Sequence, residues 1–178
     1  MAKLRMRAVL SALAAGILIT IGGCTEQAPT SNSTPEDGAR YQRLEMQQSA
    51  SGGAAYDAPG AEKVIGTEGG TLEIFGGHTL TFPAGALNAP TRIRAKVDAR
   101  YVQVDLEPHG ITFPVGREPV LTLNYGAAGA SVPASRLTII YLDQAGRFLE
   151  DMRGTAPTGQ PMVVAKLPHF SKYAVASY

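Results

Sequence analysis

The chain has 178 residues, and its 16 basic and 15 acidic side chains give a formal net charge of +1. This near balance lacks the clustered positive charge of a nucleic-acid-binding surface. A single cysteine excludes a disulfide bond within the chain, and the lack of tryptophan argues against a carbohydrate platform built from stacked aromatic rings.

The first 23 residues have the pattern of a secretory signal peptide. Lys3, Arg5 and Arg7 give a basic start, and residues 8–21 are almost all apolar or small. This stretch is short for a helix that spans a bilayer but typical of a signal peptide. Removing the three basic residues with the signal leaves 13 basic against 15 acidic residues, a net charge of about −2.

The signal pattern ends in Ile21-Gly22-Gly23-Cys24. This sequence resembles the bacterial lipobox, in which an aliphatic residue and two small ones precede an acylated cysteine. We interpret Cys24 as the site of a covalent lipid such as palmitate, which would anchor the protein to the membrane of the cell envelope. The alternative is an ordinary signal peptide with a chance cysteine. Thr25 follows in place of the aspartate that resembles an inner-membrane retention signal, so a Gram-negative source would place the protein at the outer membrane.

Residues 24–61 are poor in large apolar side chains and rich in Ser, Pro, Gly, Gln and Ala. Such a composition cannot bury enough surface to offset the entropy of ordering, so we expect a disordered, flexible linker. Within it, residues 39–48 could form a short helix with Tyr41, Leu44 and Met46, although isolated helices of this length are marginal in water. The alternative is a docking peptide for a partner.

From residue 62 onward the sequence reads as short strands separated by turns. Leu72 and Ile74 alternate with polar residues, and Gly76-Gly77 then predicts a hairpin that leads into residues 78–82. Residues 83–87 begin with a proline and predict one helical turn.

Four basic residues at 92, 94, 96 and 100 alternate with apolar residues, a pattern typical of a strand with one solvated face. They are Arg92, Arg94, Lys96 and Arg100. An anionic surface partner is the alternative.

The stretch from Leu106 to Tyr125 predicts two strands meeting at a tight turn. Pro108-His109-Gly110 has turn composition, because Gly110 can adopt the positive φ that such a turn often needs. The inward-facing residues are expected to be Val102, Val104, Leu106, Ile111, Phe113, Leu121, Leu123 and Tyr125.

Further strands are predicted at residues 137–142, 148–152, 162–167 and 173–177, with a turn at 143–146. The count is about nine short strands with no long helical pattern outside the signal. Such a sequence predicts an all-β domain at 62–178, an antiparallel β-sandwich that can fold without disulfides.

Several sequence strings resemble the ZU-five domain. They are GGTLEIF, HTLTFPAGAL, TRIRAKV, LEPHGITF, PVLTLNYG and LPHFSKYAVA, and the similarity covers roughly Val64 to Ser177. This β-sandwich module occurs in zonula occludens proteins, Unc-five netrin receptors, ankyrins and bacterial surface proteins. The resemblance implies a binding or structural module, with another envelope protein as a possible partner. Neither the partner nor the oligomeric state follows from the sequence.

His169-Phe170-Ser171 matches the His-Phe-Ser at which some proteins with this module cleave their own chain. By resemblance, Ser171 would be the nucleophile, His169 the base, and Phe170–Ser171 the cleaved bond. The base would activate the serine hydroxyl by taking its proton. The alternative is structural: His169 and Ser171 share strand parity, and Phe170 packs into the core.

Other chemistry finds little support in the sequence. His78, His109 and His169 lack paired ligand spacing, and Asp98, Asp105 and Glu107 lack the spacing of a calcium loop, so we expect no metal and no cofactor beyond the lipid. The chain has neither a Gly-x-Ser-x-Gly elbow nor a phosphate-binding loop. The sequence therefore favours a membrane-anchored, non-enzymatic protein, with a hydrolase of unrecognised site as a further alternative.

Overall fold

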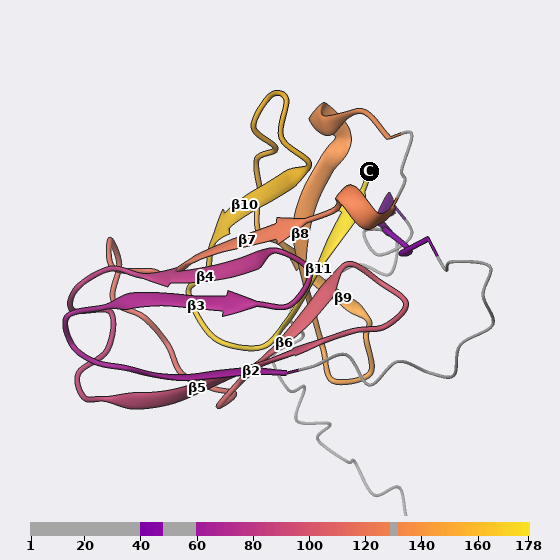
Figure 1. The fold of residues 1–178 in the computed structure, drawn as a ribbon. Coiled ribbons are helices and arrows are strands. Elements are labelled where there is room, and N and C mark those ends of the chain that lie inside the picture. Colours follow the sequence, from indigo (N-terminus) through magenta and orange to yellow (C-terminus); the bar gives the residue numbers. More distant parts are fainter. Residues whose placement is uncertain (1–39, 48–59, 129–131) are drawn as a thin grey trace, which may run out of the picture. The chain divides into compact units, whose positions relative to one another are not determined.

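The computed structural model describes residues 40–47, 60–128 and 132–178, which form two antiparallel β-sheets packed together (Figure 1). These residues contain eleven strands and two short 3-10 helices. The prediction of an all-β sandwich is confirmed. In the same part of the chain, no helix has the length and apolar character needed to cross a bilayer. Residues 1–39, with the predicted signal peptide and Cys24, lie outside the described residues.

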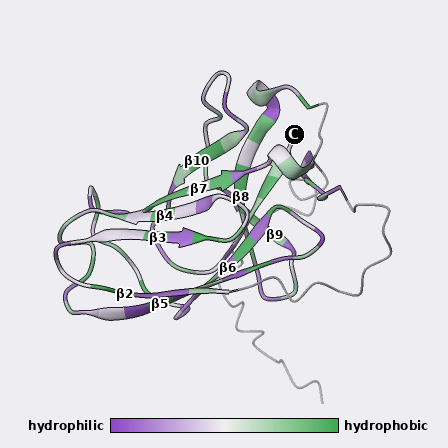
Figure 2. Cartoon of the chain, in the orientation of Figure 1, coloured by the Kyte–Doolittle hydropathy of each residue, from purple (hydrophilic) through white to green (hydrophobic). Residues whose placement is uncertain are grey.

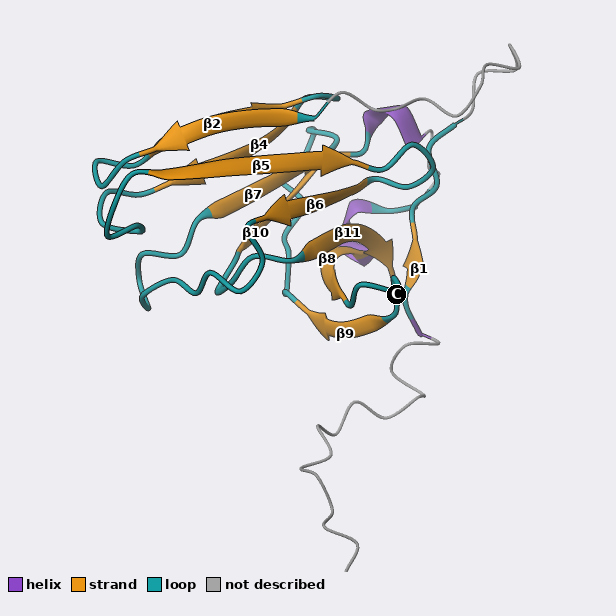
Figure 3. Ribbon diagram, turned by 90° about the horizontal axis from the view of Figure 1, so that it is seen from below, coloured by secondary structure: helices purple, strands orange, loops and turns teal. Residues whose placement is uncertain are grey.

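The strands are β1 (Gln42–Arg43), β2 (Ala61–Ile65), β3 (Gly70–Ile74), β4 (His78–Phe82), β5 (Thr91–Val97), β6 (Gln103–Glu107), β7 (Val120–Asn124), β8 (Leu137–Leu142), β9 (Phe148–Asp151), β10 (Met162–Lys166) and β11 (Lys172–Ser177), and the helices are η1 (Gly126–Ala128) and η2 (Ala134–Arg136). One sheet has the order β2-β5-β6-β11-β8-β9, with β1 also paired to β11. The other has the order β10-β7-β4-β3. Figure 3 shows the larger sheet curling at its β8–β9 end.

Apolar side chains alternate along the strands and meet between the two sheets, where they form the core. Figure 2 shows the apolar residues of the strands in green. Leu80, Leu106 and Leu121 have no exposed surface. Phe82, Phe113 and Phe170 meet edge to face at the centre, with ring centroids 5.0–6.1 Å apart.

A smaller apolar cluster lies on the opposite face of β8 and β11. Its buried members are Ile140, Leu142, Ala174 and Ala176. Tyr41 and Phe148 pack against it, with their rings stacked at 4.7 Å. The larger sheet is therefore apolar on both faces at this end.

The predicted hairpin at Gly76-Gly77 is confirmed between β3 and β4, which pair from Gly70–Phe82 to Ile74–His78. Both glycines have positive φ, +85° and +76°, a backbone conformation that glycine adopts without strain.

The stretch from Leu106 to Tyr125 differs from its prediction. Its two strands, β6 and β7, do not pair with each other and belong to different sheets. Between them the chain crosses the sandwich, making an isolated bridge between Thr112 and His169. Prolines at 114 and 119 remove backbone donors that a continuous ladder would need. The inward direction of Phe113 is confirmed, since its exposed fraction is 8%.

Two smaller expectations are also wrong. Residues 83–87 form a hydrogen-bonded turn in place of a helical turn, because Gly85 has a φ of +76°, outside the right-handed helical region. Arg100 lies in the loop after β5, whereas Arg92, Arg94 and Lys96 point outward from that strand as predicted.

The predicted linker contains an ordered strand segment. The helix expected at residues 39–48 is wrong, because Gln42–Arg43 form strand β1 against β11. Leu44, with an exposed fraction of 5%, enters the main core. The sandwich therefore includes residues that lie well before its expected start at 62.

Candidate functional site

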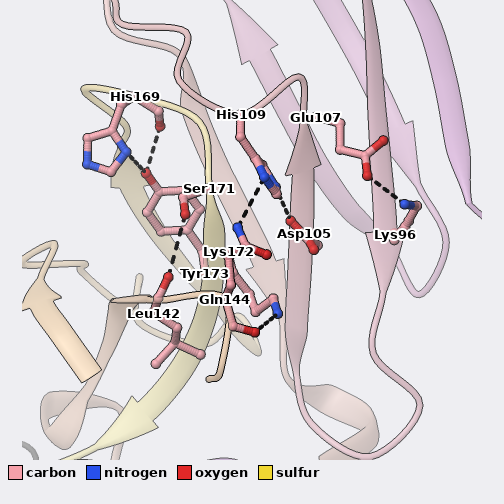
Figure 4. Close-up of polar contacts among 10 residues, drawn as sticks. All are labelled: Lys96, Asp105, Glu107, His109, Leu142, Gln144, His169, Ser171, Lys172 and Tyr173. Atoms are coloured by element: carbon pink, nitrogen blue, oxygen red, sulfur yellow. Dashed lines mark hydrogen bonds and ion pairs between the residues drawn. The ribbon is translucent and has the colours of Figure 1, made fainter. Parts of the chain in front are cut away.

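The His-Phe-Ser motif lies at the bend that leads into β11, where Figure 4 shows its polar contacts. Phe170 is buried in the core, as the structural alternative predicted. Ser171 is 7% exposed, and its hydroxyl donates a long hydrogen bond of 3.5 Å to the Leu142 carbonyl. Ser171 O accepts from Leu106 N at 3.0 Å, so the peptide between Ser171 and Lys172, directly after the candidate cleavage bond, is held in the sheet.

The His169 side chain contacts Tyr173 rather than Ser171. The Tyr173 hydroxyl donates to the His169 carbonyl at 2.6 Å and lies 3.1 Å from His169 Nδ1. Since that hydroxyl proton is used on the carbonyl, Nδ1–H can donate to the hydroxyl oxygen. In Figure 4 the second ring nitrogen faces away from Ser171. The geometry thus joins His169 to Tyr173 and does not pair it with the proposed nucleophile.

The His169–Tyr173 contact has the character of a tyrosine corner. In many β-sandwiches a buried tyrosine hydroxyl bonds to the backbone a few residues upstream and fixes the entry to a strand. Burial raises the pKa of the Tyr173 phenol and lowers the pKa of His169. Both groups are therefore neutral at pH 7, and the arrangement favours a structural role for the motif.

We expect the purified protein to remain uncut at Phe170–Ser171, because the Ser171 hydroxyl has no hydrogen bond to a base among the described residues. Intact mass spectrometry of the wild type and of Ser171→Ala should each give one uncut species. A fragment ending at Phe170 in the wild type and missing from the variant would revive the self-cleaving alternative.

His109 lies in a second polar cluster, at the corner after β6. Its Nε2 donates to Asp105 at 2.7 Å, and the Gln144 amide lies 3.1 Å from Nδ1. Lys172 donates to the Gln144 carbonyl at 3.0 Å. Both ring nitrogens are engaged, so His109 is a hydrogen-bonded corner residue that joins two loops (Figure 4).

The outer face of β2, β5 and β6 carries a ladder of opposite charges. Arg92 and Arg94 both contact Glu62, and Lys96 contacts Glu107. The Arg94 guanidinium, and after it that of Arg92, holds the pKa of the Glu62 carboxyl below its usual range. Because the paired side chains are exposed to solvent, these ion pairs contribute little to stability.

The described residues contain no group of three His, Cys, Asp or Glu side chains that could hold a metal ion. His78 is far from such a role, since it is 2% exposed and its Nδ1 accepts from the Asn124 backbone N–H at 2.9 Å. Burial lowers its pKa to about 4.

The segment from Arg40 to Gln47 is bonded on both sides, a feature that the sequence analysis missed. On one side Leu44 N donates to Val175 O at 2.9 Å. On the other, Val102 N donates to Leu44 O at 3.0 Å and Met46 N donates to Arg100 O at 2.7 Å. The alternation of Leu44, Glu45 and Met46 is the strand signal that could have identified it.

Charged and aromatic side chains hold the same segment. Arg43 donates to Gln103 at 2.9 Å and its guanidinium lies 3.9 Å from the centre of the Tyr101 ring. Glu45 pairs with Arg100 at 3.0 Å. This segment is therefore an inserted strand of the larger sheet.

No protein-family model matches the chain, and a comparison with curated proteins finds no match.

Proposed function

We propose that the protein is a lipid-anchored lipoprotein of the cell envelope that presents a non-enzymatic β-sandwich as a binding or structural module. The observation that carries this proposal is the position of the sole cysteine, Cys24, directly after a basic start, an apolar stretch and Ile21-Gly22-Gly23. A protein that is exported with one cysteine cannot use it for an internal disulfide, and acylation gives it a role.

The resemblance to the ZU-five domain supports a module of this kind. The strings that carry the resemblance coincide with β3, β4, β5, β7 and β11 and with the corner after β6. Members of that family act mostly in interactions. The partner we propose is another envelope protein, and an outer-membrane location follows if the source is Gram-negative.

Replacing Cys24 with alanine should abolish incorporation of radiolabelled palmitate and release the protein from the membrane fraction, because durable anchoring depends on buried acyl chains. A Thr25→Ala variant, which keeps the thiol, should label as the wild type does. Label retained by Cys24→Ala would refute the anchoring proposal.

The partner can be sought by affinity capture from envelope fractions. The bait should begin before Arg40, because a fragment that begins at Ala61 lacks the inserted strand with Leu44. A Val115→Ala bait is a useful comparison, since Val115 is 97% exposed at a loop tip and its loss leaves the core intact.

A further inference from the structure

The inserted strand fixes where the chain leaves the sandwich toward Cys24. Gln42 pairs with Ser177 and Arg43 with Ala176, so Arg40 lies beside the C-terminal end of β11. This end of the larger sheet also holds the start of β8, since Leu137 pairs with Ser177. The corner after β6 lies at the opposite end, because β6 and β11 are antiparallel.

The position of Arg40 limits the distance between this end and the lipid. Sixteen peptide links separate Cys24 from Arg40, which can span at most roughly 55 Å. A flexible chain of that length has an average end-to-end distance of about 22 Å. A linker free as far as Ala61 would have 37 links and a reach of roughly 130 Å. Docking of the strand therefore holds this end of the domain near the membrane, an argument that rests on the proposed function.

The surface at this end has a composition suited to a membrane interface. An open depression of about 360 Å³ is lined by Arg40, Arg136, Val132, Pro133 and Tyr178, among others, and no acidic residue lines it. Tyr178 is 46% exposed. We call this the Arg40–Arg136 surface.

The two arginines of this surface differ from those on the outer face of β5. Arg92 and Arg94 are paired with Glu62, whereas neither Arg40 nor Arg136 pairs with an Asp or Glu side chain among the described residues. Arg136 Nε donates at 2.7 Å to the main-chain O of Tyr178, which is a carboxylate oxygen in the sequence as printed. This contact positions the guanidinium and leaves its two Nη groups for an outside acceptor.

We propose that the Arg40–Arg136 surface binds the phosphate groups of phospholipid headgroups in the membrane that holds the Cys24 lipid. Guanidinium groups match phosphate with paired, charge-assisted hydrogen bonds, and a half-exposed tyrosine beside apolar residues suits the boundary between headgroups and water. Each contact is weak in solution. The short tether raises the effective concentration of headgroups at this surface, so weak contacts suffice to orient the domain.

The test uses the full acylated chain reconstituted in vesicles of phosphatidylglycerol and phosphatidylethanolamine that contain a lipid with a nitroxide headgroup. With Cys24 acylated, a single introduced cysteine carries the fluorophore. Ser135→Cys places it beside the Arg40–Arg136 surface, and Val115→Cys places it on the loop at the opposite end. We expect stronger quenching of the Ser135 label than of the Val115 label.

Charge reversal separates headgroup binding from simple tethering. Arg40→Glu with Arg136→Glu should cause loss of the excess quenching at Ser135→Cys, whereas Arg92→Glu with Arg94→Glu, an equal change of charge elsewhere, should leave it in place. Arg40→Glu by itself should reduce the excess quenching at Ser135→Cys. This single variant removes no hydrogen bond between described residues, so it controls for a folding defect in the double variant.

The outcomes distinguish the two proposals. An acylated, vesicle-bound protein with equal quenching at both labels, or with quenching insensitive to the Arg40 and Arg136 reversals, overturns the headgroup contact and leaves the anchor standing. A chain whose mass lacks an acyl group at Cys24 and which does not bind vesicles refutes the proposed function, and the tether argument with it.

Discussion

Replacing Leu44 with alanine should lower the free energy of unfolding by about 2–5 kcal/mol, the usual cost of truncating a buried leucine in a core. Leu44 lies in a stretch whose composition predicts a flexible linker, yet its side chain is 5% exposed and belongs to the main core cluster. Its N–H and C=O bond to Val175 and Val102 on either side. The substitution removes apolar contacts and leaves these backbone bonds without packing above them.

The matched control is Glu45→Ala, one residue further along. Glu45 is exposed, and its ion pair with Arg100 at 3.0 Å lies on the surface, where such pairs contribute about 0–1 kcal/mol. Urea unfolding of residues 25–178 gives both values. If Leu44→Ala cost no more than Glu45→Ala, the segment would not be docked in solution, and the position of the tether would have to be revised.

The strands that the sequence predicts well are short runs of mainly apolar residues bounded by turn residues. β8 has the predicted bounds, Leu137–Leu142, and β10 and β11 differ from prediction by one residue at one end. One face of each strand lies in the main core, and β8 and β11 are buried on their other face as well, so the apolar run itself indicates the strand.

The missed strands lack that pattern. β2 has one buried residue, Ile65, while Val64 is 54% exposed, because the strand lies at the edge of its sheet. β1 is two residues long and pairs with Ala176 and Ser177, and Leu44 directly after it bonds to Val175 and Val102, all of them distant in sequence. No local pattern specifies partners of that kind, and a short apolar spacing that fits a helix also fits a strand.

The same limit applies to the candidate site. The sequence identified His169 and Ser171 and correctly placed Phe170 in the core, but not the partner of the histidine. That partner, Tyr173, is four residues away, and its hydroxyl reaches back to His169 because the chain bends at Ser171. A buried tyrosine near the start of a strand is the signal of a tyrosine corner, and it was present in the sequence.

Stability should fall by about 3 kcal/mol between pH 7 and pH 4 through His78, beyond the loss that other groups cause. Burial lowers the pKa of this histidine to about 4 in the folded protein, against 6.5 for an ordinary histidine. Near pH 7 the ring is neutral in both states. Between pH 6.5 and about pH 4, His78 binds a proton in the unfolded chain but stays neutral in the folded protein. Lowering the pH through this range therefore favours the unfolded chain, and the free energy of unfolding decreases.

His78→Asn isolates this contribution. An asparagine oxygen can accept the Asn124 N–H in place of Nδ1, which accepts it at 2.9 Å, but it does not titrate. The variant should be less stable than the wild type at pH 7, because a smaller side chain fills a buried site, and the difference should shrink or reverse by pH 4. Contributions from the rest of the chain are common to both proteins and cancel in the difference. Urea midpoints at several pH values measure it, and a difference that stays constant with pH would show that His78 is protonated as readily in the folded protein as in the unfolded chain.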